Sequence, residues 1–297
     1  MKIKNKLLLT ILLLTITIIP INTLAYSDYI IASGKTIGIE VNSNGVLVVG
    51  FYEVDNSYLA KDAGFEIGDK IIKVNETKVN SISEMVEALK QEQENETIFT
   101  ITRDNKEKTI KIQLLEDENK VLKTGLYVKD QINGIGTLTY IDPGTRRFGA
   151  LGHEIIETTT AQKFEIKDGK IFKANVSNIK KSRDGAAGEK NANYDKTTSE
   201  GEIDNNDITG IYGNYQEEIS NMETLEVGTK DEITTGKATI KTVIENNKVE
   251  EFEINILAID KNSKTKNILF EITDEKLLNK TGGVVQAVSY THLTLPT

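Results

Sequence analysis

Residues 121–286 consist of short strand-like runs separated by turn signals, and this pattern restricts the possible fold classes more than any other feature. The apolar period of an amphipathic helix is nearly absent, which argues against a fold that alternates strands with helices. We therefore predict a mainly-β chain whose second unit, 121–286, is an all-β barrel or sandwich. The Gly-, Asn- and Lys-rich stretch 184–207 is predicted to be a loop.

Residues 33–116 are predicted to form a first unit that mixes strands with one clear helix. Residues 81–90 place four apolar side chains on one helical face: Ile82, Met85, Val86 and Leu89. Ser81 and Glu84 fit a capping box at the start of this helix. The charged residues 116–120 then link the first unit to the second.

The order of these elements resembles a PDZ domain, an α+β fold. Residues 63–75, with the sequence AGFEIGDKIIKVN, carry the most specific part of the resemblance. PDZ domains bind an extended peptide as an added strand. The resemblance places that peptide beside Ile37, Gly38 and Ile39, with the helix as the opposite wall. Met85 is then a groove residue or a core residue, because a helix of this length buries one face in either case.

Residues 1–25 have the layout of a secretory signal peptide or a helical membrane anchor. Lys2, Lys4 and Lys6 form a positive start, and an apolar run follows from residue 7 to residue 19. The run has no amphipathic period, which disfavours a buried core helix. Left uncut, it is just long enough to cross a bilayer. We expect the protein to be exported across the membrane or anchored in it.

Composition excludes several kinds of functional site. The chain has no cysteine and two histidines, His153 and His292, so disulfides, thiol nucleophiles and thiolate or His-rich metal centres are excluded. Its 36 basic and 45 acidic residues give a net charge of −9, which disfavours a nucleic-acid partner held by phosphate contacts. An all-oxygen cation site stays open, but we predict neither a cofactor nor a metal.

His153 is the residue best suited to proton transfer at neutral pH. It ends the glycine-rich sequence FGALGH, residues 148–153, whose small side chains leave an imidazole accessible. A single histidine is more often packed or solvated than catalytic, so the pattern alone leaves both roles open.

Several motifs resemble the stage IV sporulation protein B peptidase family, at matching spacing over nearly the whole chain. The order of export signal, PDZ domain and peptidase domain is similar as well. The resemblance implies a serine peptidase with a chymotrypsin-like double β-barrel, incomplete at its C-terminal end. The motifs are GIGTLTY at 134–140, FGALGH at 148–153, GEI at 201–203, TGIYG at 209–213, ITDEKLL at 272–278 and TGGVVQ at 281–286.

The resemblance assigns roles to two residues. His153 matches the general base, and Asp274 matches the acid that orients the imidazole. Without the family, Asp274 fits a turn or N-cap residue. The family nucleophile lies in a Gly-Met-Ser-Gly-Ser-Pro motif directly after TGGVVQ, where this chain has AVSY. Ser289 has the position of the nucleophile, but its neighbours do not fit the motif.

Residues 287–297 are predicted to be a non-native tail. From Val288 the sequence VSYTHLTLPT resembles a translated sequencing adapter and lacks the Lys, Glu and Asn that dominate the preceding chain. A genuine terminal strand is the alternative. If residues 287–297 are a non-native tail, Ser289 and His292 have no evolved function. The chain is then expected to be inactive because the nucleophile motif is missing.

The resemblance implies an exported sporulation endopeptidase that acts between mother cell and forespore. It would cleave itself and a membrane-bound regulator of the protease that matures the late mother-cell sigma factor, while its PDZ domain binds a peptide. Membrane association through residues 7–25 is expected, and a nucleic-acid partner is not. The alternative is a non-catalytic scaffold of the cell envelope, in which the PDZ domain recruits partners.

Overall fold

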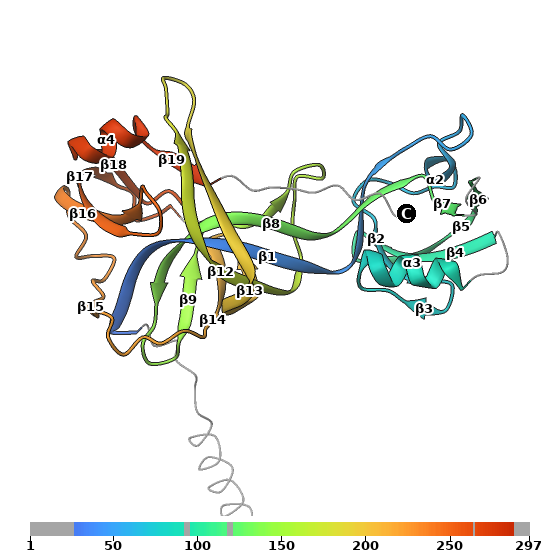
Figure 1. The fold of residues 1–297 in the computed structure, drawn as a ribbon, viewed down its shortest axis with the longest axis horizontal. Helices are drawn as coiled ribbons and strands as arrows, with labels where there is room; N and C mark the ends of the chain where they lie inside the picture. Colours follow the sequence, from blue (N-terminus) through green and yellow to red (C-terminus); the bar gives the residue numbers. More distant parts are fainter. Residues whose placement is uncertain (1–26, 92–95, 118–120, 264, 288–297) are drawn as a thin grey trace, which may run out of the picture.

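The computed structural model describes residues 27–91, 96–117, 121–263 and 265–287. The predicted signal or anchor at 1–25, and the tail from Val288 with Ser289 and His292, lie outside the described residues. Figure 1 shows two lobes joined by two long strands, β1 (Tyr29–Phe51) and β8 (Leu126–Ile141). We call them the small lobe, built on residues 43–130, and the barrel lobe, built on the rest. Among the described residues, the structure contains no helix long and apolar enough to span a membrane.

The small lobe packs two helices against short strands. Ser81 caps α3 by accepting a hydrogen bond from the Glu84 backbone N–H at 3.2 Å, as the sequence predicts. The buried face of α3 contributes Met85, Ala88 and Leu89 to a core shared with the strands. Apart from β1 and β8, the elements are α2 (Leu59–Asp62), β2 (Lys70–Val74), β3 (Thr77–Lys78), α3 (Ile82–Lys90), β4 (Glu96–Arg103), β5 (Lys106–Gln113), β6 (Leu115–Glu116) and β7 (Leu122–Lys123).

Six antiparallel strands close into a barrel. Each pairs with the next in the order β1, β8, β9, β14, β13 and β12, and β12 pairs with β1 again. The barrel interior is apolar and includes Ile37, Ile39, Val41, Phe148, Ile171, Ile203 and Ile211. The prediction of a mainly-β chain is confirmed, and of the two options for the second unit the structure has a barrel. The four strands not yet introduced are β9 (Arg147–Ala150), β12 (Ile166–Lys180), β13 (Gly188–Asp207) and β14 (Gly210–Tyr215).

The lobes do not follow the predicted division into residues 33–116 and 121–286. Residues 31–42 of β1 pair with β8, and most of them also pair with β12, so they complete the barrel. Conversely, Leu126 and Val128 at the start of β8 are buried in the small-lobe core. The difference arises because tertiary contacts decide which strand pairs with which, and a local sequence pattern does not report them.

A separate sheet of three strands, β16, β17 and β18, lies with α4 at the end of the barrel away from the small lobe (Figure 1). Leu277 of α4 packs in a small apolar cluster with Phe252 of this sheet. Within the described residues the sheet does not close on itself, so the structure shows one barrel and not the expected two. The remaining elements are β10 (Ile156–Glu157), β11 (Gln162–Lys163), β15 (Leu225–Glu226), β16 (Gly236–Val243), β17 (Val249–Ile259), β18 (Ile268–Ile272), α4 (Glu275–Thr281) and β19 (Val285–Ala287).

The prediction of a loop at 184–207 is wrong for most of that stretch. β13 runs through it and pairs with β12 on one side and β14 on the other. Its first residues alternate in burial, with Gly188, Lys190 and Ala192 inside. Residues that are typical of loops are extended here because β12 pairs with them along most of β13 and β14 pairs with residues 201–207, and these strands satisfy their backbone groups.

Candidate active site

His153 lies just after β9, where the chain turns sharply. Leu151 and Gly152 adopt positive φ angles of 72° and 79°. The imidazole is exposed, and its Nδ1 lies 2.9 Å from the carbonyl oxygen of Glu154. A carbonyl oxygen only accepts, so this hydrogen bond requires the proton on Nδ1 and leaves Nε2 as the free basic nitrogen. The histidine is therefore accessible, as its glycine-rich neighbourhood predicts.

Asp274 lies at the N-terminus of α4, directly after the three-stranded sheet. Its Oδ1 accepts a hydrogen bond from the Leu277 backbone N–H at 2.9 Å, so it is the N-cap of this helix. The cap role that the sequence offered as an alternative is therefore present. Although the structure describes both side chains, it joins Asp274 to His153 by neither a hydrogen bond nor an ion pair.

The prediction that a peptide adds beside Ile37, Gly38 and Ile39 is wrong. Gly38 pairs with β8 on one side and with β12 on the other. An added strand needs a free edge, and here both edges are occupied. Ile37 and Ile39 are buried in the barrel interior, and a Cβ on Gly38 would lie 2.2 Å from the Tyr194 ring. The glycine accommodates this tyrosine and not a ligand.

Met85 is a core residue. Its side chain is 0% exposed and belongs to the small-lobe core together with Phe65 and Phe99. A residue that lined an open groove would keep part of its surface accessible. The structure therefore decides between the two roles that the sequence left open for Met85.

The segment that follows His153 is a hairpin whose base is held by one buried amide. The Phe164 N–H donates to the Ile155 carbonyl oxygen at 2.9 Å and closes the hairpin. Asn206 of β13, 4% exposed, accepts from the Ile155 N–H at 2.8 Å and donates to the carbonyl oxygens of Ile155 and Phe164 at 3.0 and 2.9 Å. This one side chain therefore satisfies backbone groups at both ends of the hairpin.

A buried ion pair joins the same hairpin to β8. Lys129 Nζ donates to Glu157 Oε1 at 2.7 Å, and the two side chains are 2% and 1% exposed. The other carboxylate oxygen accepts from the backbone N–H groups of Thr159 and Thr160 at 2.8 and 2.7 Å. Burial acts to raise the pKa of Glu157, but these hydrogen bonds and the Lys129 charge outweigh it and lower that pKa below 4.5.

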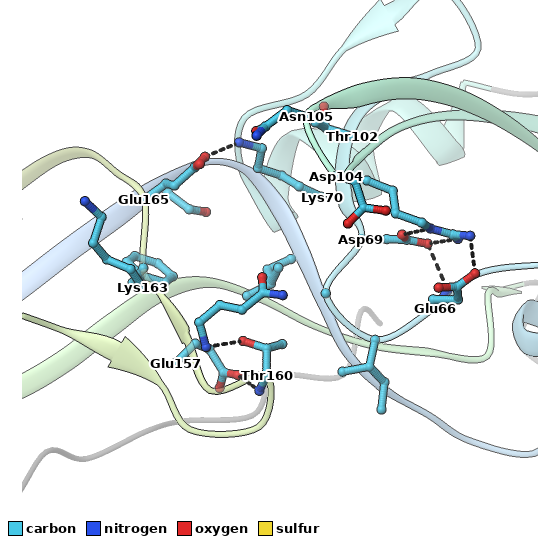
Figure 2. Close-up of a pocket in the computed structure, with 17 residues that line it drawn as sticks. Glu66, Asp69, Lys70, Thr102, Asp104, Asn105, Glu157, Thr160, Lys163 and Glu165 are labelled. Carbon is cyan, nitrogen blue, oxygen red and sulfur yellow. Dashed lines mark hydrogen bonds and ion pairs between the residues drawn. The ribbon is translucent and has the colours of Figure 1, made fainter.

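A cavity of about 440 Å³ opens between the lobes beside this hairpin (Figure 2). Arg103 contacts the buried carboxylate of Asp69 at 2.6 Å on the small-lobe wall. Lys70 of the small lobe forms an ion pair with Glu165 of the barrel lobe. The cavity is thus largely polar, and ion pairs hold its walls together. Within the described part of the chain, no group of three or more His, Asp or Glu side chains is arranged to hold a metal ion.

Comparison with known families identifies the chain. The family model described as SpoIVB peptidase S55 matches residues 120–293, more than half of the chain, and a PDZ domain model matches residues 36–114. The chain belongs to the SpoIVB peptidase S55 family. No curated protein matches it. Among solved structures, the PDZ domain of an SdrC-like protein from Listeria monocytogenes is similar, with 17% identity over 30% of this chain and 90% of its own, and a TM-score of 0.25.

The S55 match contains both His153 and Asp274 and supports a serine peptidase. The PDZ match confirms the predicted PDZ domain, which is the small lobe of this S55 peptidase. That match starts at residue 36, whereas residues 36–42 lie in the barrel of the structure. The core that is common to the PDZ match and to the small lobe of the structure therefore begins at Val46.

Sequence reasoning missed Lys129, Glu157 and Asn206. Lys129 stands in the apolar strand sequence LYVKD, and a charge in such a run is the one available signal. Its partner lies 28 residues away along the chain, with β9 and the His153 turn between them. No local pattern links two positions of this kind.

Acid should weaken the contact that Glu157 makes. A carboxyl whose pKa is lowered by folding contributes stability above its unfolded pKa, near 4.5, and loses that contribution as the pH falls through the folded value. We expect the free energy of unfolding to fall on acidification, and to fall less in Glu157→Gln, which cannot titrate at this position. Urea unfolding at neutral pH and at about pH 3 measures both losses. Equal losses in the two proteins would contradict this role.

Proposed function

We propose that this S55 peptidase is an exported serine endopeptidase of endospore formation in which His153 is the general base. The observation that carries the proposal is the exposed imidazole after β9, whose Nδ1 is bonded to a backbone carbonyl and whose Nε2 has no hydrogen-bond partner among the described residues. Nε2 can then accept the proton of a serine hydroxyl, which is a weak nucleophile without an adjacent base. The S55 match, which includes His153, supports the same chemistry.

Asp274 is the proposed acidic partner of His153. In a serine triad the carboxylate holds the imidazole tautomer and stabilises the imidazolium. Asp274 Oδ1 caps α4, so the contact with His153 requires the other carboxylate oxygen. It also requires Nδ1 of His153 to exchange the Glu154 carbonyl for this carboxylate. The cap and the triad contact are compatible because a carboxylate has two acceptor oxygens.

The nucleophilic serine belongs directly after residue 286 in this proposal. There β19 pairs with Gly188, Glu189 and Lys190 of β13, so the next residues start from a strand fixed to the barrel. A serine turn at this place would also supply backbone N–H donors for the tetrahedral oxyanion. Ser289 has the position but not the neighbours, and we propose that the chain with this tail is inactive.

The proposed substrates are protein segments outside the cytoplasm. They are the chain itself and a membrane-bound regulator whose cleavage leads to maturation of the late mother-cell sigma factor. The Lys-rich start and apolar run of residues 1–25 support export or anchoring, and the family description supports a role in sporulation. The PDZ match supports peptide binding by the small lobe, at a place other than residues 37–39.

Labelling with a fluorophosphonate tests the proposal, because this reagent reacts with serines that an adjacent base activates. The test uses the full chain with residues 287–297 replaced by the natural continuation of the gene. We expect mass spectrometry to find the label on a serine shortly after residue 286, and to find none in the same protein carrying His153→Ala. The chain with its present tail should stay unlabelled.

A non-catalytic scaffold is the second candidate function. The lack of a bond between the described side chains of His153 and Asp274 favours it. We call the chain with residues 287–297 replaced the repaired chain. If it folds, as judged by circular dichroism, but takes up no label, the scaffold function is established and the peptidase function is overturned.

A further inference from the structure

We propose that Lys129 and Glu157 are positioning residues for His153, and that they dock the histidine-bearing segment onto the small lobe. The inference rests on the proposed role of His153 as general base. It assigns to the buried ion pair between the lobes a task beyond stability, which is to fix where the imidazole stands relative to the barrel.

The first step concerns the segment itself. Residues 151–165 connect β9 to β12, and they carry His153 and then the hairpin of β10 and β11. Asn206 fixes the base of this hairpin to β13 through three hydrogen bonds. His153 stands two residues before Ile155, the first residue that Asn206 holds. A movement of the hairpin base would therefore shift the backbone two residues from the histidine.

The second step concerns the far side of the hairpin, where Asn206 does not reach. Both carboxylate oxygens of Glu157 are hydrogen-bonded there. One accepts from Lys129, and the other accepts from the Thr159 and Thr160 N–H groups. At 1% exposure the carboxylate has no access to water as a substitute partner. Removing Lys129 would leave a buried charge unpaired, and the hairpin would move to hydrate it.

The third step places Lys129 on the small lobe. Its strand pairs Lys129 with Leu47 and Val128 with Val48, within the stretch of β1 that belongs to the small lobe. Val128 and Val48 are both members of the small-lobe core. The lysine backbone is therefore part of that lobe, whereas Glu157 and His153 belong to the barrel lobe. The ion pair therefore connects the small lobe to the hairpin that follows the proposed base.

The molecule supplies a matched control in a second ion pair between the same two lobes. Lys70 of β2 contacts Glu165, at the end of the same segment. These side chains are 22% and 63% exposed, in contrast to 2% and 1% for Lys129 and Glu157. Water can replace a partner at an exposed pair, and such pairs contribute little. The proposal therefore predicts a strong effect for Lys129→Met and a weak one for Lys70→Met.

Hydrogen exchange measured by NMR provides a test that does not depend on activity. In the chain with its present tail, we expect Lys129→Met to speed exchange of the Ile155, Thr159 and Thr160 amides by more than about tenfold relative to the small-lobe core amides. Lys70→Met should leave the exchange rates of these amides unchanged. Lys129→Arg, which keeps the positive charge, should keep most of the protection. Unchanged protection in Lys129→Met would overturn the proposal.

Kinetics of the repaired chain provide the second measurement. We expect Lys129→Met to lower kcat for a short peptide by about 10- to 100-fold with little change in KM, because a small misplacement of a catalytic group has an effect of this size. If Lys129→Met does not fold, the double variant Lys129→Met with Glu157→Gln decides, since it leaves no unpaired charge. A fully active double variant would overturn the positioning role.

The two proposals fail in different ways. If His153→Ala leaves the repaired chain active, the proposed base is wrong whatever the exchange rates show. If His153→Ala is inactive while Lys129→Met and Lys70→Met have the same kcat, the base is right and the positioning role is wrong.

Discussion

His153→Ala should abolish peptidase activity in the repaired chain. Loss of the triad histidine removes about six orders of magnitude in kcat in a well-studied serine protease, because the serine hydroxyl then has no proton acceptor. Self-cleavage followed over time and turnover of a peptide substrate measure the effect. The free energy of unfolding should stay within about 0.5 kcal/mol, because the imidazole is exposed and, within the described residues, bonds only to its neighbour's carbonyl.

Asp274 provides the matched comparison, since the structure separates its two roles. Asn is as good an N-cap as Asp, so Asp274→Asn should keep α4 stable while it removes the carboxylate. If Asp274 is the triad acid, kcat should fall by about 10⁴-fold because the imidazole loses its correct tautomer. Asp274→Ala should in addition lose about 1 kcal/mol of stability. Full activity in Asp274→Asn would leave only the cap role.

Gly213→Ala should disrupt the barrel. Gly213 lies in β14, and a Cβ placed on it would stand 1.8 Å from the carbonyl oxygen of Glu202 in the adjacent strand. The obstacle is backbone and not a flexible side chain, so relief requires β13 and β14 to separate. We expect a loss of more than about 3 kcal/mol in the free energy of unfolding, measured with urea.

Gly144→Ala is the control for this substitution. Gly144 lies in the exposed turn between β8 and β9, and the atom nearest to its added Cβ is Asp142 Oδ1 at 3.4 Å. A change of at most about 0.5 kcal/mol is expected. If both variants unfold at the same urea concentration as the parent, the close packing of β13 against β14 is not rigid.

The local features of the fold could be predicted from the sequence. The apolar spacing of Met85 and Leu89 and the capping residue Ser81 are enough to place α3, because helix formation depends on neighbours within one or two turns. His153 could likewise be found from its own surroundings, since small neighbours leave an imidazole accessible.

The non-local features could not be predicted. Ile37, Gly38 and Ile39 have a strand pattern that fits either lobe, and only their pairing with β8 and β12 decides that they line the barrel. In β13 the composition is that of a loop, but its pairing with β12 and, over residues 201–207, with β14 overrides that preference. Lys129 and Glu157 show the same limit for function, because each is an ordinary charged residue until the fold buries them together.

The strands β1 and β8 make the small lobe an insertion inside a single hairpin. Their pairing starts at Phe51 with Leu126, within the small lobe, and ends at Ile31 with Ile141 in the barrel lobe. During synthesis the first strand of the barrel emerges long before its partner, so the barrel depends on a contact that is distant in sequence. A folded small lobe holds the starts of the two strands together, so the remaining pairing closes a loop no longer than an ordinary turn. A fragment that began at residue 121 would lack this strand and would leave β8 and β12 with open edges, which invite aggregation.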